Sequence, residues 1–512
     1  MSLNDRYLLS HLNLEFDVEN DIDPLAKDYF ELGTVEVLSG NYQKAVEAYE
    51  QTIALAPKFA SAYLGRGIAY ERLGELELAI ADYTRLIELD PMDDYAYKKR
   101  GDLQTILGNY LQAIADYSRV IDLNPPWAYI YQKRGDIYFQ MGNYPQAIAD
   151  YTSAIHYSPK MVSAYQNRAA AFERLGDFAS AVSNYSRAIQ LEPQDGFLFK
   201  KRAAVYERMG DHELALADYT QAIRIQPHDA QAYERRGILF ERMGNHSAAI
   251  DELGKAIELD PSCATAYYNR GVAYERRGSY RHAIADYTIA IQMGLHNAQA
   301  YTGRGNARLQ SGEVKSAIED YTQAIRLDPQ QPSAYQNRGV AYERIGDFQK
   351  AVADYTKAIE LDARRAAAYF ARGNAYGEMG EYTQQIADYS KAIELDPNLA
   401  AAHFNRGAAF LSAASPEMAI ADFTQAIALT PQDAQAYLKR GEAYEQLGDH
   451  RAAWEDYHAA LKHSQEAALR RLAQRGLRRL RRRSMWRGLF QRDDSTGSLP
   501  SNSLHDPPKG EK

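Results

Sequence analysis

The sequence predicts an all-α protein, an α-solenoid of antiparallel helix pairs with a further helix capping its C-terminal end. One phrase of 34 residues recurs thirteen times over residues 26–465 without gaining or losing a residue. Within each copy, apolar and aromatic residues recur at the spacing of a helical face, once in each half. Glycine and proline recur where each of the two helices has to end. A register this strict is the signature of stacked repeats, in which no copy buries its apolar face alone.

Each position of the repeat has a physical role. We number the positions 1 to 34, with position 1 at Ala26, Ala60, Asp94, Ala128, Val162, Gly196, Ala230, Ala264, Ala298, Pro332, Ala366, Ala400 and Ala434. Positions 4, 7, 8 and 11 lie on one face of the first helix, and positions 20, 24 and 27 lie on one face of the second. Glycine or alanine at position 8 is expected to face alanine at position 20, so that the helices approach closely with aromatic rings around the contact. Glycine at position 15 is expected to end the first helix, and proline at position 32 the second.

The tyrosines belong to this pattern, because positions 4, 11 and 24 hold 29 of the chain's 39 tyrosines. The aromatic, glycine, alanine and proline positions resemble the tetratricopeptide repeat, in thirteen tandem copies over residues 26–465. The resemblance implies a right-handed superhelix whose first helices line a concave groove for protein or peptide partners. It implies no cofactor and no small-molecule substrate.

Position 7 departs from the family pattern, in which leucine is usual. Twelve copies carry arginine there, from Arg66 to Arg440, and eleven of these carry an acid at position 23 of the second helix. The first copy lacks both, with Leu32 at position 7 and Ala48 at position 23. We therefore predict a partly buried arginine–carboxylate pair between the two helices of a repeat, which fixes their register more than it adds stability. The alternative is that both side chains extend to water.

The candidate binding residues lie on the first helices. Copies 8 to 12 carry one asparagine each, alternately at position 6 and position 9, and an amide both donates and accepts hydrogen bonds, as an extended peptide backbone requires. Copies 3 to 7 are mainly basic at position 6, although Asp102 and Asp136 at position 9 dilute this charge. The predicted peptide-binding residues are Asn269, Asn306, Asn337, Asn374 and Asn405 with the neighbouring Tyr268, Phe370 and Phe404, and the basic Lys99, Lys133, Lys201 and Arg235. The alternative is a solvated groove without a ligand.

The C-terminal end is strongly basic, because residues 462–492 hold eleven lysines and arginines and one acid, whereas the whole chain has a formal charge of −9. Residues 466–492 are predicted to form an Arg-rich amphipathic capping helix that covers the last repeat with Leu469, Leu472, Ala473, Leu477 and Leu480. The opposite face is a candidate contact for an anionic membrane or for nucleic acid, through Arg470, Arg471, Arg475, Arg478, Arg479, Arg482, Arg483 and Trp486. A solvated polar face is the alternative.

The remaining composition gives weaker information. Residues 1–25 form an acidic N-terminal segment, and residues 493–512, with three prolines, are expected to be a disordered tail. The single cysteine excludes an intrachain disulfide framework, and no stretch approaches the ~20 apolar residues of a membrane-spanning helix. The first residues lack a basic segment followed by an apolar one, so we expect no secretory signal and a cytoplasmic protein, with attachment to a membrane surface as the alternative.

No catalytic or metal-binding arrangement is predicted, and no cofactor is expected. The twelve histidines lack the spacing of metal ligands, and the carboxylates recur with the repeat, which favours a structural role. We therefore predict a non-enzymatic protein–protein interaction scaffold. An adaptor that docks on a membrane surface or on nucleic acid through residues 466–492 is the second hypothesis, and a regulatory subunit of a separately encoded enzyme is the third.

Overall fold

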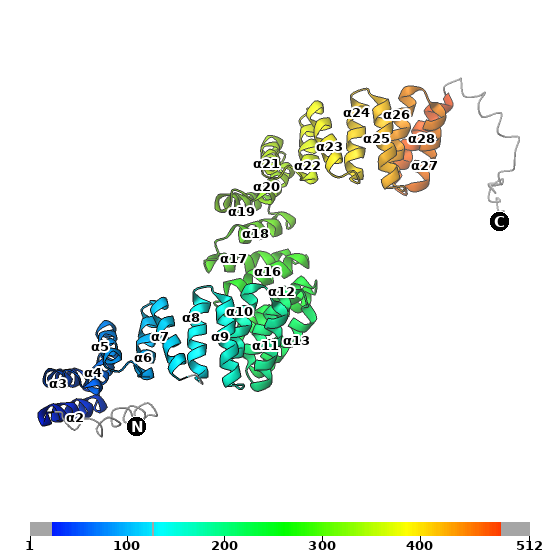
Figure 1. The fold of residues 1–512 in the computed structure, drawn as a ribbon. Coiled ribbons are helices and arrows are strands. Elements are labelled where there is room, and N and C mark those ends of the chain that lie inside the picture. Colours follow the sequence, from blue (N-terminus) through cyan, green and yellow to red (C-terminus); the bar gives the residue numbers. More distant parts are fainter. Residues whose placement is uncertain (1–22, 125–126, 483–512) are drawn as a thin grey trace, which may run out of the picture. The chain divides into compact units, whose positions relative to one another are not determined.

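The computed structural model describes residues 23–124 and 127–482, and every regular element within them is an α-helix. The predicted all-α solenoid of helix pairs is therefore confirmed. The helices belong to two compact units, Met1–Pro261 and Ser262–Lys512, each described by itself (Figure 1). Three predictions fall outside the described residues: the N-terminal segment as far as residue 22, the part of the capping helix beyond residue 482 with its contact residues Arg483 and Trp486, and the tail at 493–512.

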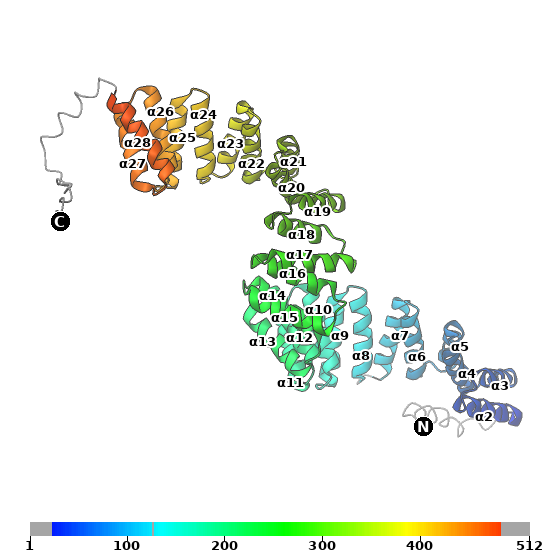
Figure 2. The ribbon, with the colours of Figure 1, turned by 180° about the vertical axis from the view of Figure 1, so that it is seen from behind.

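The first unit holds seven helix pairs, one for each of copies 1 to 7 (Figures 1 and 2). We call the first helix of a pair the A helix and the second the B helix; each B helix also packs against the next A helix of the unit. The pairs are α2 (Pro24–Leu38) with α3 (Tyr42–Leu55), α4 (Ala60–Leu73) with α5 (Leu76–Leu89), α6 (Asp94–Ile106) with α7 (Tyr110–Leu123), α8 (Ala128–Gln140) with α9 (Tyr144–Tyr157), α10 (Val162–Leu175) with α11 (Phe178–Leu191), α12 (Gly196–Met209) with α13 (His212–Ile225), and α14 (Ala230–Arg242) with α15 (His246–Leu259).

The second unit holds six pairs, for copies 8 to 13, and a final single helix. The pairs are α16 (Ala264–Arg276) with α17 (Tyr280–Gln292), α18 (Ala298–Gln310) with α19 (Val314–Leu327), α20 (Pro332–Arg344) with α21 (Phe348–Leu361), α22 (Ala366–Glu378) with α23 (Tyr382–Leu395), α24 (Ala400–Ser412) with α25 (Pro416–Leu429), and α26 (Ala434–Leu447) with α27 (His450–His463). The final helix is α28 (Ala467–Arg482).

The helix ends lie where the sequence places them, with one difference. Helix α2 begins at Pro24, two residues before the predicted start of the repeats, because the carboxylate of Asp23 accepts a hydrogen bond from the backbone N–H of Leu25 at 2.9 Å. At position 15, twelve glycines have φ between 76° and 88°, the left-handed conformation that ends an A helix. Copy 12 has Ala414 there, which adopts φ 56° and is the one non-glycine among the described residues with a positive φ.

The residue at position 8 is small because the aromatic ring of the residue at position 24 packs directly against it. A Cβ added to Gly339 would lie 2.7 Å from Cε1 of Tyr355, closer than two carbon atoms can approach. The predicted neighbour, alanine at position 20, is therefore not the closest contact, since the tyrosine ring extends further from the B helix than alanine does. The tyrosines at position 24 are almost completely buried and form the centre of each repeat.

Helix α28 covers the end of the second unit, packed against α26 and α27. Ala473, Leu477 and Leu480 are buried there, and a Cβ added to Gly476 would lie 2.5 Å from the ring of Tyr457. The prediction for Leu472 is wrong, because this side chain is 43% exposed. The contact centres on the small residues that allow close approach, and Leu472 is rotated by about 100° from its neighbour Ala473 around the helix.

Candidate binding surface

The A and B helices of eleven repeats are joined by the predicted arginine–carboxylate pair. In copy 10, Nε and Nη2 of Arg338 donate to the two carboxylate oxygens of Asp354 at 2.7 and 2.8 Å. The Asp354 side chain is 9% exposed, and burial raises the pKa of the equivalent Asp82 even though a guanidinium is paired with it. Eleven copies form this pair, and in copy 5 Arg168 donates to the amide oxygen of Asn184 instead. The prediction is confirmed.

The same arginines also join neighbouring repeats, which the sequence reasoning missed. Nη1 of Arg338 donates to the hydroxyl of Thr322, at position 25 of the preceding B helix, at 3.0 Å. Ten arginines make this bond. The signal was present in the sequence as threonine or serine at position 25, 16 residues before each of these arginines. Each of these guanidiniums therefore links three helices.

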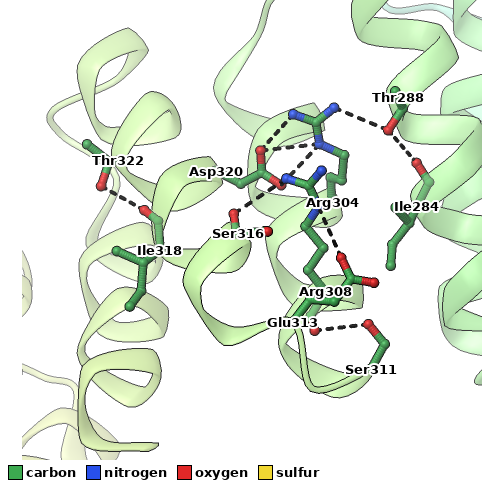
Figure 3. A network of polar contacts seen from close by, with 10 residues as sticks. All are labelled: Ile284, Thr288, Arg304, Arg308, Ser311, Glu313, Ser316, Ile318, Asp320 and Thr322. Atoms are coloured by element: carbon green, nitrogen blue, oxygen red, sulfur yellow. Dashed lines mark hydrogen bonds and ion pairs between the residues drawn. The ribbon is translucent and has the colours of Figure 1, made fainter. Parts of the chain in front are cut away.

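Copy 9 adds a second guanidinium to this network (Figure 3). Arg308 stands at position 11, where ten copies carry an aromatic residue, and its Nη1 donates to Oδ2 of Asp320 at 2.7 Å. Arg304 donates through Nη2 to Oδ1 of the same carboxylate at 2.7 Å and through Nη1 to the hydroxyl of Thr288 at 3.2 Å. Nε of Arg308 also lies 3.9 Å from the carboxylate of Glu313, so both arginines are engaged by groups of the repeats and this cluster has a structural role.

The buried tyrosines at position 24 use acceptors on the A helix of their own repeat. Six of the eleven hydroxyls donate to a glutamate at position 12, as Tyr355 does to Glu343 at 2.7 Å. The other five bond with a side chain at position 9, as Tyr117 does with Asp102 at 2.7 Å. Many of the acids near the candidate binding residues are therefore already hydrogen-bonded to the core.

The five asparagines of the second unit do not form one evenly spaced line. Nδ2 of Asn337 donates to Oδ1 of Asn306 at 2.9 Å, and Nδ2 of Asn405 donates to Oδ1 of Asn374 at 3.0 Å. The two acceptors at position 9 also accept from the hydroxyls of Tyr321 and Tyr389. In each pair the acceptor belongs to the copy that precedes the donor's copy, so the pair joins two successive A helices. The result is two inter-repeat pairs. Asn269 belongs to neither, because its Nδ2 donates to the carbonyl oxygen of Thr265 in the same helix at 2.9 Å.

This pairing divides the asparagines by role. The position-9 oxygens of Asn306 and Asn374 each accept two hydrogen bonds, which fills both lone pairs. The position-6 oxygens of Asn269, Asn337 and Asn405 accept none from the described residues. We call the outer face of the A helices, where these oxygens lie, the A-helix surface. Of the five asparagines, only the three at position 6 keep an amide oxygen for a ligand.

A cavity of about 460 Å³ lies on this surface of the second unit, over three successive A helices, α16, α18 and α20. It contains one of the asparagine pairs. Burial raises the pKa of Glu275 in its wall, and Arg344 donates through Nη1 to the carbonyl oxygen of Leu309 at 2.6 Å. The cavity is lined by Glu275, Arg276, Tyr280, Asn306, Leu309, Gln310, Tyr321, Asn337, Val340 and Arg344.

The aromatic residues predicted beside the asparagines are half-buried. Tyr268, Phe370 and Phe404 stand at position 5, and each packs against the ring at position 24 of its own repeat, with centroids 5.6 to 5.7 Å apart. They belong partly to the core and present only part of each ring to the surface.

The four basic residues predicted in the first unit are not equivalent. Nζ of Lys99 donates to the Glu71 carboxylate of the preceding A helix at 2.9 Å. Lys133, Lys201 and Arg235 form no ion pair with any described residue. These three are therefore the basic residues whose charge is not matched by an acid in contact.

The arginines of α28 also divide into two groups. Arg470 donates to the carbonyl oxygens of Leu461 and Ser464 at the end of α27, and Arg479 forms an ion pair with Glu445 at 2.8 Å. These two hold the cap in place. Four others are exposed along one line of the helix without a partner among the described residues, namely Arg471, Arg475, Arg478 and Arg482.

The described residues contain no group of three or more histidine, cysteine, aspartate or glutamate side chains placed to hold a metal ion. None of the helices described is both long and apolar enough to cross a lipid bilayer.

Family models match most of residues 30–465. A model described as "TPR repeat" matches residues 101–142, 135–176, 242–278, 305–346, 378–412 and 417–448. Models described as "Tetratricopeptide repeat" match residues 30–94, 332–364, 162–195, 201–229, 264–293 and 434–465. No protein among the curated proteins matches the chain.

Solved structures of repeat proteins are similar to the chain. YrrB, described as a TPR protein with an unusual peptide-binding site, is 25% identical, with a TM-score of 0.33 over 36% of this chain and 95% of its own. The APC/C hetero-tetramer Cut9-Hcn1 is 16% identical, with a TM-score of 0.39 over 86% of this chain and 99% of its own. Yeast Tom70 is 18% identical, with a TM-score of 0.33 over 84% of this chain and 95% of its own.

Proposed function

We propose that this chain, which belongs to the tetratricopeptide repeat family, is a non-enzymatic scaffold that binds an extended peptide segment of a protein partner on the A helices of its second unit. A protein–protein interaction scaffold is the general role that the family supports. The peptide and the place of its binding are our proposal.

The cavity over α16, α18 and α20 is the observation that carries it. Its volume of about 460 Å³ lies within the range of ligand-binding pockets, which is roughly 300 to 1,000 Å³. Three successive repeats contribute to it, so a ligand that fills it contacts more than one copy. Its lining combines tyrosine rings, amides and arginines, which suits a peptide with both backbone and side-chain contacts.

Asn337 is the residue that we assign to the peptide backbone. Its Nδ2 already donates one hydrogen to Asn306, so it keeps a second N–H and the whole of its Oδ1. Asn306 is a positioning residue, because its oxygen is held by Tyr321 and Asn337 and fixes the orientation of Asn337. By the same reasoning Asn269 and Asn405 are ligand contacts, two repeats to either side of Asn337.

Replacing Asn269, Asn337 and Asn405 together with alanine is expected to remove at least one protein partner, since the three free amide oxygens are lost. Partners are identified by affinity purification of the full chain from its native cell, followed by quantitative mass spectrometry. A matched variant replaces Gln292, Gln323 and Gln425, exposed amides on B helices of the same unit, with alanine. Equal partner recovery by the two variants would contradict the proposed site, provided that both retain the helical circular dichroism of the unchanged chain.

A second candidate function is electrostatic docking on an anionic membrane, favoured by the four exposed arginines of α28. Their spacing of four, three and four residues places them along one face. The apolar side of α28 is buried against α26 and α27, so the helix has no apolar face to insert and binding would rest on charge.

Docking of this kind is expected to bring the chain to the top of a density gradient with phosphatidylserine vesicles at low salt, and not with phosphatidylcholine vesicles. Replacing Arg471, Arg475, Arg478 and Arg482 with glutamine should abolish the flotation. Replacing the exposed B-helix residues Arg187, Arg224, Arg281 and Arg326 with glutamine removes the same charge elsewhere. Flotation that survives the first set, or is lost equally with both, argues against the candidate.

A further inference from the structure

We propose that the A-helix surface of the first unit binds a separate ligand, an extended acidic peptide whose carboxylates contact Lys133, Lys201 and Arg235. This inference rests on the proposed scaffold function, and it assigns a second surface and a partner chemistry to it. The second unit offers amides to a peptide backbone, whereas the first unit offers cations to acidic side chains.

Lysine and aromatic side chains are paired on this surface. Nζ of Lys133 lies 5.3 Å from the ring centroid of Tyr129, and Nζ of Lys201 lies 5.1 Å from that of Phe197. Each aromatic residue stands at position 2, one helical turn before the lysine at position 6. Tyr129 and Phe197 are 46% and 40% exposed, which is unusual for such large apolar rings. Each pair therefore presents a charge beside an apolar surface, and a ligand that carries an acid next to an apolar side chain complements both.

The acids of the same surface form no ion pair with these three cations, although Asp102 and Asp136 lie near enough to Lys133 to attract its charge. Oδ1 of Asp136 accepts hydrogen bonds from the Tyr151 hydroxyl and from Asn167. Asp102 accepts from the Tyr117 hydroxyl and forms an ion pair with Lys98. These carboxylates are bound within the repeats. The three cations, in contrast, have no acidic partner among the described residues.

The corresponding positions in the second unit lack this chemistry. Positions 2 and 6 are Gln299 and Gly303 in copy 9, and Ala367 and Ala371 in copy 11. The cation–aromatic pairs are thus a feature of the first unit and not of the repeat itself.

The repeat fixes the spacing that a ligand needs. Packed helices lie roughly 10 Å apart, and an extended peptide rises about 3.3 Å per residue, so one repeat corresponds to about three residues of ligand. Lys133 and Lys201 are two copies apart, and Arg235 follows one copy later. A matching peptide carries its second and third carboxylates about six and about nine residues after the first.

A nucleic acid fits this surface less well than such a peptide. Its phosphates follow one another without interruption, and between the three cations they would meet the carboxylates of Asp136, Glu173 and Glu207. Separate carboxylates at the spacing of the cations avoid these acids.

The test measures binding of a fluorescein-labelled peptide to the full chain by fluorescence anisotropy. The peptide carries three aspartates at the spacing above, with leucine beside the first two, in a glycine–serine background. Exchanging Lys133→Gln and Lys201→Gln together should weaken its affinity by about tenfold or more, because two matched charges are lost. The matched control, Lys160→Gln with Lys255→Gln, removes two exposed charges elsewhere in the first unit and should change the affinity by less than about twofold.

Three results would overturn the inference: equal weakening in both lysine variants, equal binding of a peptide of the same composition with adjacent aspartates, or equally tight binding of a single-stranded RNA of the same charge. The alanine variant of Asn269, Asn337 and Asn405 serves as a further control and should bind the acidic peptide normally. Loss of its partners with retained peptide binding would support both proposals. Normal recovery of its partners, together with peptide binding that still depends on Lys133 and Lys201, would contradict only the proposal for the second unit.

Discussion

Raising the pH from about 10 to about 12 is expected to unfold both units, with loss of helix and formation of tyrosinate sharing one midpoint. The cause is the tyrosine at position 24 of eleven copies. Burial raises the pKa of each of these hydroxyls, to about 12 for Tyr49 and above its ordinary value for Tyr83, Tyr117, Tyr151, Tyr185, Tyr219, Tyr287, Tyr321, Tyr355, Tyr389 and Tyr457.

The sign follows from which state holds the proton. Below about pH 10 the folded and unfolded chains both keep these tyrosines protonated, so the stability that burial provides is fully present. Above that pH the unfolded chain releases the protons and the folded chain retains them, so stability falls by about 1.4 kcal/mol per pH unit for each tyrosine. Six of these tyrosines lie in the first unit and five in the second, so the first unit loses roughly 8 kcal/mol per pH unit and the second roughly 7 kcal/mol. A domain of ordinary stability, about 5 to 15 kcal/mol, therefore unfolds when the pH rises by one or two pH units.

The measurement follows far-ultraviolet circular dichroism and tyrosinate absorbance in the same titration. Exposed tyrosines should ionise first without loss of helix, and the buried ones only as the helices unfold. Tyr355→Phe supplies a matched variant, since copy 12 already carries a buried phenylalanine, Phe423, at this position. It should move the unfolding midpoint of its unit to higher pH. Complete tyrosinate formation in a chain that stays helical would contradict the expectation.

Most of the fold could be predicted because its signals are local and repeated thirteen times. Glycine at position 15 marks a left-handed residue, and the repeat is strong enough to impose that conformation on Ala414 as well. The arginine–carboxylate pair could be predicted because Leu32 and Ala48 change together in the first copy. The failure at Leu472 has a different origin, since the last helix follows no repeat and its contact depends on the close approach of Gly476 to Tyr457.

The arrangement of the candidate site was less accessible to sequence reasoning. Positions 6 and 9 are neighbours on one helix, and this proximity suggests a continuous line of amides. The contact that forms instead joins position 9 of one copy to position 6 of the next, 31 residues away, as between Asn306 and Asn337. The cavity depends on side-chain volumes from five helices of three repeats, such as those of Leu309 and Val340, which no single-copy pattern describes.

Replacing Arg338 alone with leucine is expected to lower the free energy of unfolding of the second unit by about 3 kcal/mol. The substitution leaves Asp354, whose side chain is 9% exposed, without the two donors that neutralise it, and it leaves the Thr322 hydroxyl without its inter-repeat donor. A buried carboxylate that loses its partner has to be protonated or hydrated, and both cost free energy.

Replacing Arg338 with leucine and Asp354 with alanine together is expected to cost much less, about 1 kcal/mol, because no buried charge is then unmatched. The chain already carries this combination in Leu32 and Ala48 of its first copy. Urea denaturation of the single and double variants measures the difference. It is read together with hydrogen exchange of α20 and α21, because stacked repeats need not unfold in one step.

If the double variant is as unstable as the sum of its two single variants, the pair adds no coupling and the arginine acts only through its packing. If instead the double variant is nearly as stable as the unchanged chain but exchanges faster at α20, the pair fixes helix register at little net stability, which is the role that its partial burial predicts.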